Sequence, residues 1–158
     1  MRKDSFLQLI NTPWKMRLYL WGKLPAAAFM GIRVLQCSEE QATVQLPYGW
    51  RSQNPFRSIY FAAQCAAGEL STGLLGLAAL QGKPPVSMLV LNVEAAFLKK
   101  AATTLRFICL DGAKVESVVQ NALKGDVAQT IRMESIGYLP DGTEAARVWI
   151  TWSFKKKQ

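Results

Sequence analysis

Residues 58–81 read SIYFAAQCAAGELSTGLLGLAALQ, and this stretch decides the fold. It contains no proline, and most of its residues are Ala, Leu, Gly, Ser or Phe. A run of this length and composition predicts one long helix that is buried on most sides. Ala62, Ala66, Gly73 and Gly76 share one face of it, where a sheet or a second helix can approach closely. We therefore expect this helix to be the centre of the core.

The segments on either side of the helix have the pattern of antiparallel strands. Residues 32–37 and 41–46 precede it and predict a strand pair, because apolar and polar residues alternate in the second segment. The segments after it predict strands over 87–98, 103–110, 126–139 and 143–154, with a short helix near 114–123. Pro140-Asp141-Gly142 predicts a tight turn between the last two strands. The sequence thus predicts an α+β fold in which one antiparallel sheet wraps around the central helix.

The size and composition of the chain favour one domain over residues 1–158. Half of the residues are hydrophobic and 19% are charged, which is the balance of a packed globule. We find no signal-peptide pattern and no uncharged apolar run of about 18 residues, so neither secretion nor a membrane span is expected. The cysteines, Cys37, Cys65 and Cys109, have no paired spacing and are expected to be reduced thiols of a cytoplasmic protein.

The chain is basic, with a formal net charge of +8 and a pI of about 9.6. Its basic residues are scattered, apart from Lys99-Lys100 and the lysines at 155–157. General solubility and the binding of an anionic ligand both remain open as explanations. A charge-driven contact with nucleic acid or a membrane surface would require basic residues gathered on one face, and we do not expect nucleic acid to be a partner.

The chain contains no histidine. This excludes Ser-His-Asp and Cys-His catalysis, histidine-ligated zinc and any reaction that needs a histidine base. Glu69 is the one charged residue within residues 58–81. An isolated carboxylate in such a helix is costly to desolvate, so Glu69 either pairs with a donor at the edge of the core or lines a functional cleft.

The stretch NPFRSIYFAAQCAAGE, residues 54–69, resembles the signature of hot-dog acyl-coenzyme A thioesterases. In that family an asparagine precedes the segment that opens the central helix, and an acidic residue follows fifteen positions later, as Asn54 and Glu69 do here. The resemblance covers nearly the whole chain and is closest to an uncharacterised, thioesterase-like branch. It implies a hot-dog fold with an N-terminal helical extension over residues 1–30.

Two positions depart from the family pattern. Relatives carry His-Gly-Gly or Phe-Gly-Gly where this chain has Tyr60-Phe61-Ala62, and Arg57 replaces the usual glycine before a serine or threonine. The side chains at Phe61 and Ala62 can hinder the approach of a thioester, which favours the alternative of a non-catalytic protein that binds acyl-coenzyme A or an acyl chain.

The resemblance implies a role for each site residue. Glu69 activates water or attacks the thioester directly, Asn54 orients the water or the carbonyl oxygen, and amides near Phe61 and Ala62 polarise the carbonyl. Thr72 contacts the carboxylate or water, or bonds to its own backbone instead. The predicted substrate-binding residues are Tyr60, Phe61, Ala62, Thr72, Arg57, Lys99 and Lys100. No cofactor is expected beyond the coenzyme A part of an acyl-coenzyme A or acyl-carrier substrate.

The spacing of Phe61 and Glu69 along the helix predicts that two copies of the chain are needed for one site. Phe61 and Glu69 are eight residues apart, which is about 12 Å along a helix, so one helix cannot bring both to the same carbonyl. The hot-dog dimer of the family solves this with composite sites, and we expect a homodimer or a dimer of dimers. Ser58 is expected to cap the helix, and Cys65 to serve in packing.

The N-terminal region is expected to form helices over the first thirty residues. Asp4 is predicted to cap a short helix that runs to Ile10, and Pro13 to end it before a second helix over 14–21. Large apolar and basic residues are interleaved in the second helix. We expect the region to pack over the sheet edge, with capping of an acyl tunnel or contact with a membrane as alternatives.

Overall fold

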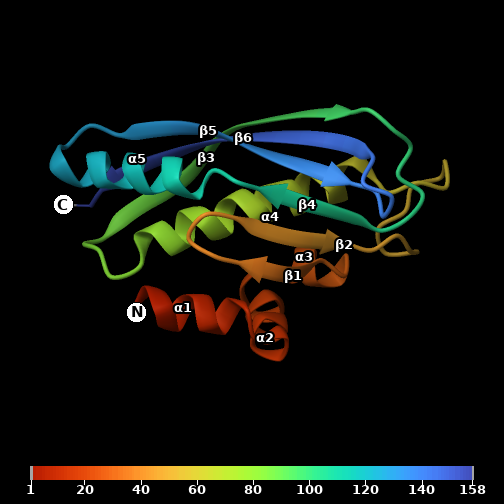
Figure 1. Ribbon diagram of the computed structural model, residues 1–158, viewed down its shortest axis with the longest axis horizontal. Coiled ribbons are helices and arrows are strands. Elements are labelled where there is room, and N and C mark those ends of the chain that lie inside the picture. The colour runs from red at the N-terminus through yellow and green to blue at the C-terminus, as the bar shows by residue number, and fades with distance from the viewer. Residues whose placement is uncertain (1, 158) are drawn as a thin grey trace.

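The computed structural model describes residues 2–157 and shows one sheet curved around one helix (Figure 1). The elements in chain order are α1 Lys3–Ile10, α2 Pro13–Lys23, α3 Pro25–Phe29, β1 Arg33–Cys37, β2 Ala42–Leu46, α4 Phe61–Leu80, β3 Val86–Phe97, β4 Leu105–Cys109, α5 Gly112–Lys124, β5 Gln129–Tyr138 and β6 Glu144–Lys156. The six strands lie in the order β1-β2-β4-β5-β6-β3, and each neighbouring pair is antiparallel. This confirms the predicted α+β hot-dog architecture with its N-terminal helices.

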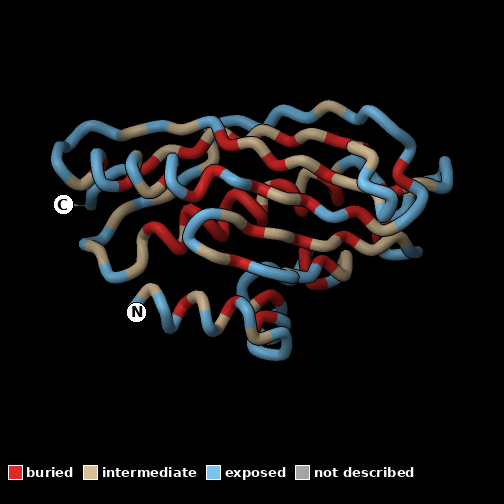
Figure 2. The backbone as a smooth tube through the Cα atoms, viewed as in Figure 1, coloured by how far each residue is buried: buried red, intermediate tan, exposed pale blue. Residues whose placement is uncertain are grey.

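The helix α4 is the centre of the core (Figure 2). Its buried side chains meet the inward side chains of the sheet, among them Phe107, Val148 and Phe154. One close approach is at Gly68, where an added Cβ would lie 2.6 Å from Cβ of Val148. The sheet therefore approaches the helix along a path that includes Gly76, as predicted, and also Gly68, which the prediction omitted.

Two predicted helix starts are wrong. The central helix begins at Phe61, and Ser58 is not its cap. The preceding residues hydrogen-bond elsewhere, since Ile59 N donates to Ala101 O and Tyr60 N donates to Ser52 O, both at 2.7 Å. Asp4 likewise lies in the first turn of α1 without capping it, where its negative charge suits the helix dipole.

The N-terminal helices pack over one edge of the sheet, as expected. Asn11, which follows α1, donates from Nδ2 to Cys37 O at 2.7 Å and accepts from Cys37 N at Oδ1 at 2.8 Å. This amide therefore mimics a neighbouring strand at the end of β1 and occupies backbone groups that an edge would otherwise expose.

The opposite edge of the sheet is the twelve-residue strand β3. Val93 pairs with the fully buried Ile150, so its side chain faces the helix side of the sheet, yet 47% of it is exposed. Leu89 and Leu91 are also exposed. This edge thus presents both an apolar surface and unpaired backbone groups.

Within residues 2–157, no helix combines the length and hydrophobicity needed to cross a bilayer.

Candidate functional site

The loop before α4 is held by the side chain of Asn54. Its Oδ1 accepts hydrogen bonds from Phe56 N at 3.0 Å, Ser58 N at 3.2 Å and Ser58 Oγ at 3.2 Å. Arg57, between them, has a φ of 57°, which is the left-handed conformation that glycine adopts most easily. The side-chain oxygen of Asn54 is therefore occupied by hydrogen bonds within the loop, and the side-chain nitrogen Nδ2 is the group that can reach a ligand.

The first turn of α4 presents free backbone donors beside this loop. Tyr60 is the N-cap residue in an extended conformation, and no side chain caps the helix. The N–H groups of Phe61 and Ala62 consequently have no acceptor within the helix, and they lie at the positive end of its dipole.

A cavity of about 380 Å³ lies at this helix start. The structure brings four of the predicted residues to its wall: Asn54, Phe61, Lys99 and Lys100. The two lysines follow the end of β3 and are exposed. Hydrogen-bond donors from the loop and two ammonium groups therefore surround one space, which suits a carbonyl-containing anionic ligand.

Gln64 also lines this cavity, and it was not predicted from the sequence. Only 6% of this residue is exposed, and its Nε2 donates to Ile59 O at 3.2 Å. Its Oε1 is the buried side-chain oxygen or nitrogen that lacks a hydrogen-bond partner in the described part of the chain. A buried acceptor left unpaired costs free energy, so it marks a place where a ligand or water can donate a hydrogen bond. The signal in the sequence was a polar residue in the first turn of a mostly apolar helix.

Aromatic rings cover the entrance. The rings of Tyr60 and Phe61 meet edge to face at 4.8 Å between centroids, and Phe61 meets Phe97 of β3 at 6.3 Å. All three side chains are about half exposed. Tyr60 and Phe61 thus form an apolar rim with Phe97 of β3, and Ala62 lies beside them on the helix.

Glu69 lies two turns further along α4, away from this cavity. Its side chain is half-buried, and burial raises the pKa of the carboxyl group. None of the ion pairs or hydrogen bonds within residues 2–157 involves its carboxylate. Within residues 2–157 the carboxylate is therefore not paired at the core edge. Gly73 leaves room for a methyl group next to it, since an added Cβ would make ordinary contacts at 3.5 Å with Glu69 Oε1 and 3.4 Å with Trp152 Cζ2.

The position of Thr72 differs from the role predicted for it. The residue is fully buried, its Oγ1 donates to the backbone oxygen of Glu69 at 2.9 Å, and it accepts from Trp152 Nε1 at 3.0 Å. The hydroxyl satisfies the buried indole and bonds back to the helix, which was the stated alternative, and it does not reach the carboxylate.

Arg57 and the three cysteines lie outside this cavity. Arg57 is exposed and does not line the cavity. Burial raises the pKa of Cys37 to about 11 and that of Cys109 to about 12, so both thiols are protonated and unreactive. Burial also raises the pKa of Cys65. No cluster of three His, Cys, Asp or Glu side chains suited to a metal ion occurs between residues 2 and 157.

Several solved structures share this architecture over almost their whole length. A protein of unknown function from Chlorobaculum tepidum superposes with a TM-score of 0.76 at 13% identity, covering 92% of this chain and 98% of that one. A provisionally assigned thioesterase from Shewanella oneidensis gives 0.76 at 13% identity, covering 96% and 99%. A thioesterase from Haemophilus influenzae gives 0.64 at 15% identity, covering 92% and 91%. These structures show that the protein has the hot-dog fold.

The family follows from the sequence itself. The model of the family described as Domain of unknown function (DUF4442) matches residues 14–153, and the chain belongs to this family. No curated protein matches the chain. The resemblance to an uncharacterised, thioesterase-like branch is thus confirmed.

Proposed function

We propose that the protein hydrolyses an acyl thioester, carried by coenzyme A or by a carrier protein, at a site shared between two copies of the chain. The proposal rests on one observation, which is that the half-buried carboxylate of Glu69 has no partner within residues 2–157. Because burial raises its pKa, the carboxylate is a stronger base than an exposed one and is suited to accept a proton from water.

The start of α4 supplies the complementary group. The N–H groups of Phe61 and Ala62 donate to the carbonyl oxygen and stabilise the negative charge that develops on it during attack. Asn54 Nδ2 orients the same oxygen or the water, and Lys99 and Lys100 contact the phosphates of coenzyme A. The reaction requires no cofactor beyond the coenzyme A part of the substrate.

This assignment requires a second copy, because one copy separates the two components. Phe61 and Glu69 lie about 12 Å apart along α4. Pairing of β3 with β3 of a second copy satisfies the open sheet edge, covers its apolar residues, and allows the α4 start of one copy to face Glu69 of the other.

Hydrolysis then consists of the attack of water on the thioester and the departure of the thiol. The oxygen of water attacks the carbonyl carbon while Glu69 takes its proton, and the carbon–sulfur bond breaks as that proton passes to the leaving thiolate. The products are a carboxylic acid and a free thiol. In the nucleophilic variant, Glu69 attacks first, and water then hydrolyses the resulting anhydride.

One observation favours non-catalytic binding as a second candidate. The ring of Phe61 stands at the helix start, where relatives carry glycine, and packs with Tyr60 and Phe97 over the entrance. Such a rim can hold an acyl chain without bringing its carbonyl onto the free amides.

Hydrolysis of a panel of acyl-coenzyme A esters, followed by release of free thiol, tests the proposal. The wild type is compared with Glu69→Gln and with Glu40→Gln, which removes an exposed carboxylate outside the site. We expect the first variant to lose at least about a hundredfold in turnover and the second to retain it. Absence of turnover on every ester, with acyl-coenzyme A still bound, would favour the binding protein.

A further inference from the structure

An apolar stripe runs along the outer face of α2. Trp14, Leu18 and Trp21 recur at helical spacing, and they are 62%, 64% and 49% exposed. Met16 and Leu20, on the other face of α2, are almost fully buried and attach the helix to the protein. The stripe is therefore not part of the core, and its large side chains meet water in an isolated copy of the chain.

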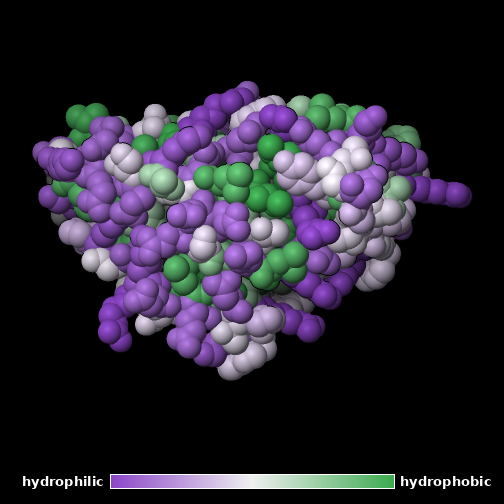
Figure 3. All heavy atoms as spheres, viewed as in Figure 1, coloured by the Kyte–Doolittle hydropathy of each residue, from purple (hydrophilic) through white to green (hydrophobic). Residues whose placement is uncertain are grey.

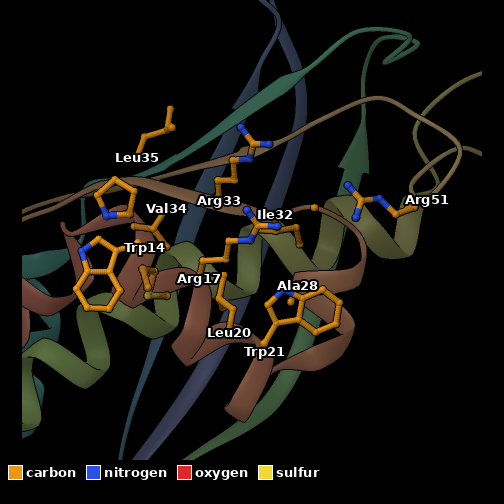
Figure 4. A pocket seen from close by; sticks show the side chains of 13 residues that line it. Trp14, Arg17, Leu20, Trp21, Ala28, Ile32, Arg33, Val34, Leu35 and Arg51 are labelled. Atoms are coloured by element: carbon orange, nitrogen blue, oxygen red, sulfur yellow. The ribbon is translucent and has the colours of Figure 1, made fainter.

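A groove of about 570 Å³ lies between this helix and β1 (Figure 4). Three arginines from different parts of the chain line it: Arg17 from α2, Arg33 from β1 and Arg51 from the loop after β2. In Figure 4, Trp14 and Trp21 stand on either side of Arg17. Basic residues that are scattered in the sequence are thus gathered on one face by the fold.

The charge of this region is uncompensated. None of the residues that line the groove is acidic, and α2 also carries Lys15 and Lys23. The ion pairs among residues 2–157 do not involve Arg17, Arg33 or Arg51. Figure 3 shows hydrophobic residues gathered on the face in view, bordered by hydrophilic ones.

We propose that the α2 face, defined here as Trp14, Leu18, Trp21 and the three arginines of the groove, docks on the surface of an anionic phospholipid bilayer. The arginines contact lipid phosphates, and the apolar stripe enters the headgroup region. Tryptophan is well suited to this depth because its ring is apolar and its N–H remains hydrogen-bonded. A helix with an apolar face flanked by basic residues lies in the interface without crossing it.

The other occupants fit the face less well. A small soluble anion in the groove would leave Leu18 exposed, since this residue does not line the groove. A second copy related by two-fold symmetry would bring the arginines of both copies together, and like charges oppose such a contact. Nucleic acid would satisfy the arginines but not the apolar stripe.

Sedimentation with lipid vesicles tests the proposal. The probes are vesicles of phosphatidylcholine alone and vesicles with equal parts of phosphatidylcholine and phosphatidylglycerol. We expect binding to the anionic vesicles to be at least about tenfold tighter, with a blue shift of tryptophan emission. Each basic residue at such a surface contributes about fivefold, so Arg17→Gln combined with Arg33→Gln should weaken binding about 25-fold.

Two further variants separate the apolar and the charged contributions. Trp14→Ser combined with Trp21→Ser keeps the charge and should weaken vesicle binding at least about tenfold. Lys155→Gln combined with Lys156→Gln removes the same charge as the arginine pair at the exposed end of β6, and it should change binding less than twofold. All the replaced side chains are exposed at least in part, and the unfolding temperature of each variant checks that it is folded.

Several outcomes would overturn the proposal. They are absence of binding to anionic vesicles, equal losses in the lysine and arginine pairs, and tryptophan variants that bind as well as the wild type. Binding of inorganic phosphate in the groove without vesicle binding would assign a soluble anion instead. Dissociation of an oligomer by the tryptophan variant, with vesicle binding unchanged, would assign the face to a second copy. None of these readouts depends on thioester hydrolysis.

Discussion

Two glycines of α4 offer a matched test of how closely the sheet approaches the helix and of the space next to Glu69. Gly68 and Gly73 both lie inside the helix, so alanine at either position gains about 1 kcal/mol of helix propensity. They differ in what the new Cβ meets. At Gly73 the nearest atoms lie at 3.4 Å and 3.5 Å, which is ordinary contact, whereas at Gly68 the Cβ of Val148 lies at 2.6 Å.

The magnitudes follow from this difference. Gly73→Ala should raise the free energy of unfolding by about 1 kcal/mol, because nothing has to move. Gly68→Ala should overpack the core against the fully buried Val148, at a cost of about 1–3 kcal/mol. After the gain in propensity, this variant should be between unchanged and about 2 kcal/mol less stable than the wild type. The two variants should therefore differ by about 1–3 kcal/mol.

Urea unfolding at equilibrium measures the difference, and an unchanged slope would show that the variants unfold like the wild type. Equal free energies of unfolding for the two variants would refute the proposed close approach at Gly68. Gly73→Ala has a second readout, because its methyl group fills the space beside Glu69 Oε1. If reacting water occupies that space, turnover should fall about tenfold or more while stability rises. Unchanged turnover would place the water elsewhere.

Three other perturbations follow from single groups. Burial raises the pKa of Glu69, so the folded protein disfavours the charged form of its carboxyl group. Glu69→Gln should therefore gain stability over the wild type as pH rises from 5 to 7. A constant difference in Tm between the two proteins over that range would contradict this. Arg57→Gly should raise the free energy of unfolding by about 0.5 kcal/mol in urea, because glycine adopts a positive φ without the clash, and Arg57→Ala should give no such gain. Glu116 is partly buried, but hydrogen bonds from Lys83, Gln120 and Lys3 outweigh this and lower its pKa to about 2. Its stabilisation is present above pH 4.5 and disappears as pH falls through 2, so Glu116→Gln should cost about 1 kcal/mol at pH 7, measured by urea unfolding, and nothing near pH 2.

The sequence predicted most of the fold because its strongest signals are local. The apolar run at 58–81, the alternation in 41–46 and the turn at Asp141-Gly142 each depend on neighbouring residues, and the structure has the corresponding elements. The start of α4 was placed three residues early. The reason is that Ile59 bonds to Ala101, some forty residues away, and no local pattern reports that contact.

The candidate site was only partly predictable for the same reason. Asn54, Phe61, Lys99 and Lys100 were expected to bind one ligand, and they do line one cavity. Gln64 was missed because its significance lies in an unpaired oxygen, which depends on the surrounding packing. The backbone bond of Thr72 was one of the two expected alternatives, but its second partner, the indole of Trp152, was not predicted because it comes from β6, eighty residues later.

The two edges of the sheet are treated differently, and this links both proposals. At β1, the side chain of Asn11 occupies the backbone of Cys37, and the N-terminal helices cover the edge. At β3, the edge is long, apolar and without a neighbour in the described chain. A second copy can therefore add its strand at β3 but not at β1. Because β1 and β3 lie at opposite ends of the strand order, such a dimer leaves the α2 face of each copy uncovered and free to meet a bilayer.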